Sequence, residues 1–320
     1  MRTPQHPIHS GFGPATTAQE VLRGADLRGR TAIVTGGYSG LGLETARALA
    51  RAGARIIVPA RDPARAQAAL QGIAGAETAP MDLADPASVD AFAARFLAGG
   101  APLDLLVASA GIMATPLTRD ARGHELQFAV NHLGHFQLAA RLWPALRRAG
   151  SARVVAYSSR GHQIAGIGWD DIDFTGHAYD KWVAYGQSKT ANALFALGLD
   201  ARGATDGIRA FSLHPGTVLG PLARHLSEAE IDAFDVRDAG GAAINAPERD
   251  LKTAAQGAAT AVWCATSGQL DGMGGVYCED CDVAPIEDAG RFGVRPWAAD
   301  PDAAERLWRL SEALTGVGIG

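Results

Sequence analysis

The chain has 320 residues, is 47% hydrophobic and carries a net charge of −5 at pH 7, so it can bury a sizeable core. This acidic balance argues against nucleic acid as a partner, and no apolar run reaches the ~18 residues that a membrane span needs. Three cysteines are too few for a disulfide framework, and the first residues show no signal peptide. We therefore expect a cytoplasmic protein.

Short apolar runs alternate with longer runs of helical period through most of the chain. Strands that are apolar on both faces and separated by helices predict a parallel sheet covered on both sides. Right-handed crossovers then favour an α/β fold with one doubly wound, mostly parallel, seven-stranded, Rossmann-like sheet. The predicted strands fall at residues 30–37, 54–61, within 76–85, and at 103–111, 152–159, 208–216 and 274–280, and a long helix is predicted from Leu126 to Arg148.

The pattern predicts a single Rossmann-like domain, residues 29–285, between two extensions. The N-terminal extension, 1–28, contains a Thr-x-x-Glu capping-box spacing before a short helix. The C-terminal extension, 286–320, contains an amphipathic helix opened by Asp-Pro and closed by Gly. Within the domain, residues 217–252 follow a strand end, where ligands of such sheets bind, and are predicted to cover the substrate.

The first strand ends in the glycine-rich turn TGGYSGLG, which opens a helix. Backbone N–H groups at such a turn and the helix N-terminus attract a pyrophosphate, and glycine allows its close approach. The pattern T-G-x-x-x-G-x-G, from Thr35 to Gly42, differs from the usual G-x-G-x-x-G fingerprint. Candidate contacts to a dinucleotide in this turn are Gly36, Tyr38, Ser39, Gly40, Leu41 and Gly42.

Tyr185 and Lys189 lie four residues apart in an apolar helical run and therefore share one helix face. A phenol has a pKa near 10, and a cation about 4–6 Å away lowers it toward neutrality. The pair therefore suits a general acid/base. Because Tyr-x-x-x-Lys is common by chance, a surface pair is the competing interpretation.

The motifs T-G-x-x-x-G-x-G, D-L, x-A-G, N-x-x-G, S-S, Y-x-x-x-K and H-P-G occur in this order. In this series the chain resembles the classical short-chain dehydrogenase/reductase superfamily, and its long insert before Tyr185 resembles retinol-dehydrogenase-like members and NADP-linked carbonyl reductases. The resemblance implies Tyr185 as general acid/base and Lys189 as the residue that tunes it and binds the nicotinamide ribose. It implies Ser159 as the hydroxyl that holds the substrate oxygen, with Ser158 as the alternative, and Asn131 as the holder of a water in a proton path.

The resemblance also implies further contacts to the cofactor. Where relatives read N-A-G this chain has Ser109, so the bracing that the Asn side chain gives in the family is in question. The implied contacts are Asp82 and Leu83 on the adenine side, Ser109, Ala110 and Gly111 after the fourth strand, and Pro215, Gly216, Thr217 and Val218 along the nicotinamide carboxamide.

The end of the second strand bears on the choice between NADP(H) and NAD(H). Ala60 occupies the position where NAD-preferring relatives carry an acid, and Arg61 follows it. A guanidinium can meet the 2′-phosphate as a planar fork, so NADP(H) is favoured over NAD(H). The alternative is that Arg61 is only a solvated charge and Asp62 takes the acidic role.

The sequence thus predicts an NADP(H)-dependent oxidoreductase that interconverts a carbonyl compound and an alcohol by hydride transfer. The apolar residues within 217–252 favour an apolar or aromatic ketone or aldehyde as the small-molecule partner. An NAD-linked alcohol dehydrogenase and a catalytically silent NADP-sensing binding protein are the alternatives, and a homo-oligomer and a monomer are both open. We expect no metal, because the Cys278-x-x-Cys281 pair has no second pair of ligands nearby.

Overall fold

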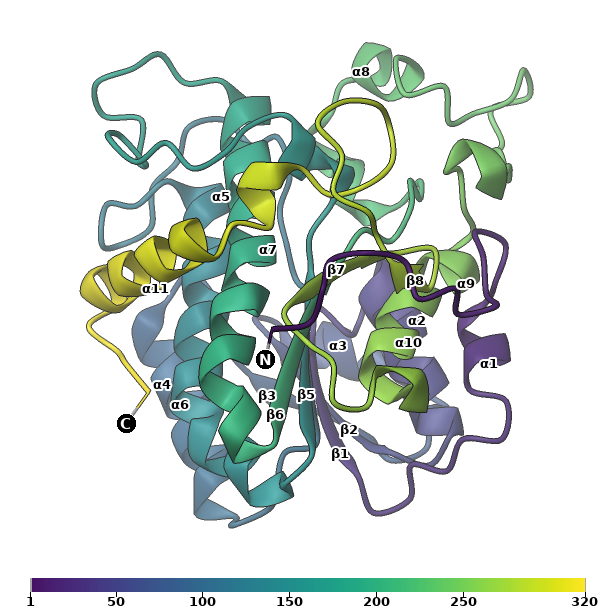
Figure 1. Cartoon of the computed structure of the whole chain (residues 1–320), viewed down its shortest axis with the longest axis vertical. Coiled ribbons are helices and arrows are strands. Elements are labelled where there is room, and N and C mark those ends of the chain that lie inside the picture. Colours follow the sequence, from purple (N-terminus) through teal and green to yellow (C-terminus); the bar gives the residue numbers. More distant parts are fainter. Residues whose placement is uncertain (1, 320) are drawn as a thin grey trace.

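The computed structural model describes residues 2–319 and contains one sheet of eight strands (Figure 1). The strands are β1 (Thr31–Thr35), β2 (Arg55–Ala60), β3 (Ala76–Pro80), β4 (Leu105–Ala108), β5 (Ala152–Tyr157), β6 (Ile208–Leu213), β7 (Val276–Glu279) and β8 (Asp282–Val283). They lie in the order β3-β2-β1-β4-β5-β6-β7-β8, with β1 to β7 parallel. From β1 the strands β2 and β3 follow toward one edge of the sheet, and β4 to β8 follow toward the other edge. This order confirms the predicted doubly wound topology.

The eighth strand is an addition to the seven predicted. Asp280 and Cys281 both have positive φ, 53° and 60°, and turn the chain into a short antiparallel pair in which Cys278 faces Val283. The predicted strand at 274–280 contains β7, and the chain turns back after it to form β8. All three cysteines are free and buried, and residues 2–319 contain no group of three His, Cys, Asp or Glu side chains suited to a metal.

Helices cover both faces of the sheet (Figure 1). They are α1 (Ala18–Val21), α2 (Gly40–Arg51), α3 (Pro63–Ala69), α4 (Pro86–Ala98), α5 (Leu126–Phe128), α6 (Gly134–Ala149), α7 (Lys181–Gly203), α8 (Glu228–Asp232), α9 (Ala254–Gly257), α10 (Ala259–Thr266) and α11 (Pro301–Thr315). Because successive strand residues point to opposite faces, Ile33 packs with α4 and α6 while its neighbour Val34 packs with α2 and α10.

Helix α7 is enclosed between the sheet and α11, so its residues 184–200 are all buried. Trp308 of α11 stacks on Phe195 of α7, with the ring planes 9° apart, and meets Phe136 of α6 edge-on at 4.8 Å. Asp300 caps the start of α11 and Gly316 ends it in a left-handed conformation, as the sequence predicts. Within residues 2–319, neither α7 nor any other helix combines the length and apolar character that crossing a membrane requires.

The N-terminal segment runs along the last edge of the sheet, over β7 and β8 (Figure 1). The Gln5 side chain donates to the carbonyl oxygens of Tyr277 and Ala284 and accepts from the Tyr277 N–H, while Asp282 accepts from the Ile8 N–H. These bonds occupy backbone groups that an exposed edge would offer to another chain. The segment continues into α1, which has the predicted capping box.

We expect Trp308→Ala to lower the free energy of unfolding by about 3–5 kcal/mol, because it empties the contact between α11 and both helices beneath it. Urea denaturation followed by circular dichroism measures this loss. Arg309→Ala, at an exposed position of the same helix, is the control and should cost less than about 1 kcal/mol. Equal losses in the two variants would contradict the packing described here.

Candidate active site

The carboxyl ends of four neighbouring strands bring the predicted site segments to one edge of the sheet. Thr35 of β1 pairs with Ala108 of β4, which pairs with Ala156 of β5. Tyr157 of β5 pairs with Leu213 of β6. The segments that leave these ends side by side are 36–42, 109–111, 158–159 and 214–218. Ligands of doubly wound sheets bind at this edge, beside the point where the strand order reverses.

The glycine turn after β1 is shaped by close backbone approaches. Gly36 has φ 66°, and a Cβ at position 42 would lie 2.5 Å from its carbonyl oxygen, so helix α2 begins directly against the turn. The space beside Gly40 is open, because a Cβ at this position would have only one atom of the described residues within 4 Å, Pro221 Cδ at 3.6 Å. The Ser39 side chain makes no capping bond within residues 2–319, so the first N–H groups of α2 stay available to an anion. Tyr38 and Leu41 are half-buried beside this opening.

The second strand ends at Ala60, so Arg61 is the first residue beyond it, as the sequence analysis assumed. Arg61 is exposed, and its guanidinium forms no ion pair or hydrogen bond with any residue from 2 to 319. The Asp62 carboxylate is already used: it caps α3 by accepting from the Arg65 N–H at 3.0 Å.

After β3, Asp82 and Leu83 form a short turn in which Asp82 accepts from the Ala84 N–H at 3.0 Å. Leu83 packs against the start of α6, where a Cβ at Gly134 would lie 2.5 Å from the Leu83 carbonyl oxygen. The glycine of the N-x-x-G motif is therefore required by the close approach of this turn.

Thr35 holds the loop after β4 in place, a role that was not predicted from the sequence. Its Oγ1 accepts hydrogen bonds from the N–H groups of Ser109 and Ala110, each at 3.0 Å, and lies 2.9 Å from His135 Nε2. The loop that carries Ser109 in place of Asn is thus held through its backbone. A hydroxyl residue at the end of β1 was a visible signal, but its partners lie 74 and 75 residues away.

Asn131 lies in a π-helical turn, Ala129–Leu133, between α5 and α6, so the predicted helix from Leu126 to Arg148 is interrupted. Such turns are frequent at functional sites. The Asn131 amide bonds both backbone groups of Ile112 and donates to Ser188 Oγ, all at 2.9 Å. A Cβ at Gly111 would lie 3.2 Å from Asn131 Oδ1 and 3.6 Å from Lys189 Nζ, so both side chains converge on this glycine.

The two serines after β5 differ in their surroundings. The buried Ser158 hydroxyl donates to the Lys189 carbonyl oxygen at 2.7 Å, inside the sheet–α7 contact. Ser159 is half-buried and accepts from the Gly161 N–H at 3.0 Å. A Cβ at Gly161 would lie 3.5 Å from Ser159 Oγ and 2.7 Å from Tyr185 Cε1, so the two side chains meet beside this glycine. The structure therefore brings Ser159 to Tyr185. His162 Nε2 accepts the Arg295 N–H, so Nδ1 carries the hydrogen and holds the Ser159 carbonyl at 2.7 Å.

The electrostatics of Tyr185 and Lys189 correct the expectation that the lysine lowers the pKa of the phenol. Burial raises the pKa of Tyr185 to about 12, and the nearby Ser159 hydroxyl offsets only part of this effect. Lys189 Nζ lies 5.6 Å from the centre of the Tyr185 ring and donates to the Tyr157 carbonyl at 3.0 Å. Burial lowers the pKa of Lys189 to about 8. Desolvation is therefore the largest cause of the pKa shift of each group.

Comparison with known proteins identifies the family. The family model described as short chain dehydrogenase matches residues 30–231. The chain belongs to the short-chain dehydrogenase/reductase family. It is 47% identical to a "Probable oxidoreductase" of Streptomyces antibioticus, over 88% of this chain and 96% of that protein. It is 35% identical to mouse "Retinol dehydrogenase 12", over 90% and 87% of the two chains. A crystal structure of an uncharacterised protein from Mycobacterium paratuberculosis superposes with a TM-score of 0.73 at 33% identity, covering 96% of this chain and 99% of that one.

Membership of the short-chain dehydrogenase/reductase family implies a nicotinamide cofactor, and the residues at the sheet edge fit one. The α2 N-terminus is open to a pyrophosphate beside Gly40, and Gly111 leaves room next to Lys189 Nζ. At the far end, Gly216 has φ 86° in the turn Pro215–Val218, beside the loop that carries Ser159. The residues thus form a continuous row along the edge.

The segment 217–252 of this short-chain dehydrogenase/reductase is held over the start of α7. Lys181 forms an ion pair with Glu230 of α8, and the rings of Trp182 and Phe234 meet at 5.7 Å. Trp182 in turn lies edge-on to Tyr185 at 6.5 Å. Residues 217–252 therefore reach the helix turn that carries Tyr185.

Replacing the buried Lys189 by methionine is expected to change the pH dependence of stability. Because the pKa falls from 10.5 to about 8 in the fold, burying the charge destabilises the wild type below about pH 8, and this penalty fades as pH rises toward 10.5. Wild type should therefore gain about 2–3 kcal/mol over K189M between pH 7 and pH 10 in urea denaturation. The Tyr157 carbonyl keeps its bond from Asn192 in this variant.

Lys181→Met provides the matched control, because Lys181 is on the same helix but partly exposed. We expect no comparable gain of wild type over K181M across this pH range. A gain of equal size in both variants would show that it does not come from the buried ammonium.

Proposed function

We propose that the chain is an NADP(H)-dependent oxidoreductase that interconverts a ketone or aldehyde and an alcohol, with Tyr185 as general acid/base. The observation that carries this proposal is that the Ser159 and Tyr185 side chains meet beside Gly161 at the sheet edge, with Lys189 Nζ 5.6 Å from the centre of the Tyr185 ring. Two hydroxyls held together beside a cation suit a substrate oxygen whose proton must be moved. When bound, the nicotinamide cofactor supplies or takes up the hydride.

The protonated phenol of Tyr185 is the form that carbonyl reduction requires. A phenol whose pKa is raised to about 12 holds its proton at neutral pH, which is the form needed to protonate the oxygen of a carbonyl undergoing reduction. Ser159 donates a hydrogen bond to that oxygen and orients it. Lys189, held by Tyr157, offers its ammonium to the ribose side of the cofactor. In the oxidising direction the same phenol must first lose its proton, which burial opposes.

The surroundings of Arg61 support NADP(H) in this proposal. The guanidinium stands at the end of β2 with no partner among residues 2–319, and Asp62 is occupied as the cap of α3. A free guanidinium at this position suits a 2′-phosphate, and an engaged carboxylate is less available to ribose hydroxyls. The alternative of an NAD-linked enzyme with Asp62 in the acidic role is therefore disfavoured.

An apolar or aromatic substrate is favoured by the side chains of the covering segment, 217–252. Leu222 and Phe234 are large apolar residues that remain exposed, 37% and 46% respectively, and Phe234 packs on Trp182 near Tyr185. Exposed apolar side chains in the segment that covers the candidate site suit an apolar ligand. The name of the relative retinol dehydrogenase 12 is in keeping with such a substrate. We place the reaction in the cytoplasm, in a catalytic domain of residues 29–285 with extensions at 1–28 and 286–320.

Tyr185→Phe should abolish most of the carbonyl reduction, with a fall in kcat of at least about 100-fold, because the proton donor is lost. NADPH and NADH oxidation at 340 nm, measured against a panel of ketones, aldehydes and quinones, gives the rate. Tyr179→Phe is the control: its hydroxyl lies 3.0 Å from the Thr115 carbonyl and from Glu125, and we assign it no part in the reaction. Equal turnover by Y185F and wild type would reject the assignment.

The same panel tests the competing class of function. A wild-type chain that binds NADPH with unit stoichiometry but oxidises it with none of the substrates would behave as the cofactor-sensing binding protein, and the enzyme proposal would fail.

For the cofactor, Arg61→Ala is expected to raise the KM for NADPH about 10- to 100-fold and to leave the KM for NADH within about twofold. The reason is that the guanidinium would meet only the 2′-phosphate, which NADH lacks. Arg65→Ala, at an exposed arginine one turn further on, controls for the loss of general positive charge. Activity of the wild type with NADH alone would refute the role of Arg61.

A further inference from the structure

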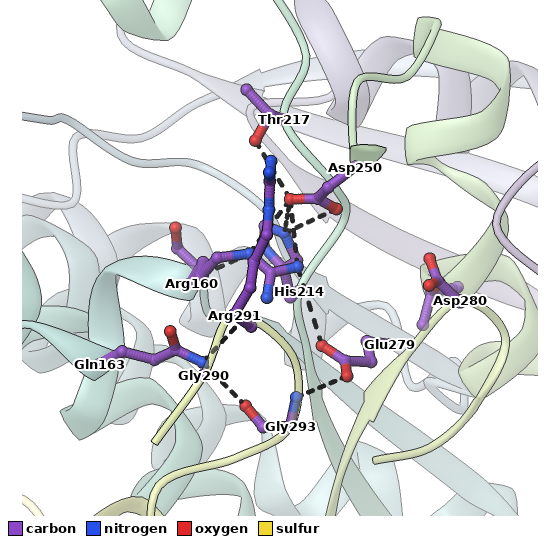
Figure 2. Close-up of polar contacts among 12 residues, drawn as sticks. Arg160, Gln163, His214, Thr217, Asp250, Glu279, Asp280, Gly290, Arg291 and Gly293 are labelled. Carbon is purple, nitrogen blue, oxygen red and sulfur yellow. Dashed lines mark hydrogen bonds and ion pairs between the residues drawn. The ribbon is translucent and has the colours of Figure 1, made fainter. Parts of the chain in front are cut away.

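The carboxylate of Asp250 collects hydrogen bonds from three residues, which lie in two separate segments of the candidate site (Figure 2). Asp250 lies in the covering segment, 217–252, and is 1% exposed. It accepts from Arg160 Nε at 3.1 Å, from His214 Nε2 at 3.0 Å and from Thr217 Oγ1 at 3.2 Å. These donors lie 90, 36 and 33 residues away in the sequence. One buried side chain therefore joins the loops after β5 and β6 to the covering segment.

The hydrogen bonds around Asp250 and His214 fix Arg160, the residue that follows Ser159. The Arg160 N–H donates to His214 Nδ1 at 3.0 Å, while the Arg160 guanidinium contacts Asp250 and lies 4.8 Å over the Phe292 ring. Both the backbone and the side chain of Arg160 are thus fixed. The orientation of the Ser159 hydroxyl depends on this peptide, because Ser159 is the preceding residue.

On the other side, the same residue holds the turn Pro215–Val218. The Thr217 N–H donates to the Asp250 carbonyl at 2.7 Å, and the Lys252 N–H donates to the Thr217 carbonyl at 2.9 Å. The two strands of chain therefore run together as a short parallel pair. The Lys252 stem lies directly on the turn, since a Cβ at Gly216 would be 2.5 Å from Lys252 Cδ. The turn has no room to shift toward Lys252.

The charge state of the group follows from its geometry. His214 Nδ1 accepts the Arg160 N–H, so Nε2 carries the hydrogen and donates it to Asp250. Burial raises the pKa of Asp250, but the contacts with His214 and the charges of Arg160 and Lys252 hold it well below its ordinary value. The carboxylate is therefore ionised at neutral pH. A buried ion pair adds little net stability compared with apolar packing, so geometry is the better reason for it here.

We propose that Asp250 is a positioning residue that fixes the Ser159 hydroxyl relative to the turn Pro215–Val218, the part of the edge proposed to hold the nicotinamide. It acts on Ser159 through Arg160 and on the turn through Thr217. The inference rests on the proposed oxidoreductase function, because the distance between the substrate oxygen and the cofactor is what Asp250 would set. Misplacement of reacting groups by about 1 Å can cost about 100-fold in rate.

The test uses Asp250→Asn in the full chain. Asparagine keeps the shape and tolerates the positive φ of 67° at this position, but its NH₂ group faces donors where an acceptor is needed. We expect kcat per binding site to fall at least about tenfold and the Kd for NADPH, from tryptophan fluorescence quenching, to rise about tenfold. Binding stoichiometry stays near one, whereas a partly unfolded protein would lower the stoichiometry and leave Kd unchanged.

Asp104→Asn is the matched control, because Asp104 is also a buried carboxylate, paired with Arg30 and the Thr31 N–H at the opposite edge of the sheet. Both constants should stay within about twofold of wild type in D104N. Arg160→Met separates the two arms: kcat per binding site should fall about tenfold while the Kd for NADPH changes less than about threefold. This variant also keeps the test decisive if D250N does not fold.

Wild-type values of both constants in D250N, or of kcat in R160M, would overturn the inference while the wild-type turnover upheld the proposed function. If the wild type itself turns over none of the carbonyl compounds with either cofactor, the proposed function fails instead, and the two failures are thereby distinguished.

Discussion

The shared carboxyl edge of β1, β4, β5 and β6 is the constraint on which the candidate site depends. Parallel strands end at the same edge, and the register of these four aligns Thr35, Ala108 and Ala156 across the sheet. Because these strand ends are neighbours, the loops that follow them lie next to one another, although they come from distant parts of the chain. Sheet order, rather than any local motif, therefore decides which residues meet.

Several ionisable groups at this edge are buried, and the fold must offset the cost. Burial lowers the pKa of Lys189 to about 8 and that of His135 to about 4, and it raises that of Tyr185 to about 12. Each shift records a free-energy penalty on the charged form. The apolar cores on both faces of the sheet and the docking of α11 on α7 supply the compensating stability. The helices that pack on the sheet and on α7 thus exclude water from the Tyr185 phenol and the Lys189 ammonium, although they supply no reacting group.

Features with a local cause could be predicted from the sequence, and features with a distant cause could not. The capping box of α1, the glycine turn and the ends of α11 are short-range patterns, and the structure contains them. The hairpin at Asp280 and Cys281 was missed because Cys281 stands where glycine usually supplies the second left-handed residue of such a turn. The hydrogen bonds of Thr35 and Asp250 join residues that are 33 to 90 positions apart in the sequence, so no local periodicity predicts them. The direction of the pKa shift of Tyr185 could not be predicted either, because it depends on how deeply the packing of the fold buries the phenol.

The arrangement of the N-terminal segment has a consequence for biosynthesis. Gln5 and Ile8 reach their partners on β7 and β8 across 272 and 274 residues. During translation these residues are made before their partners, so they stay unattached until β7 and β8 have been synthesised. Their docking therefore depends on the two strands that are made last among the eight of the sheet.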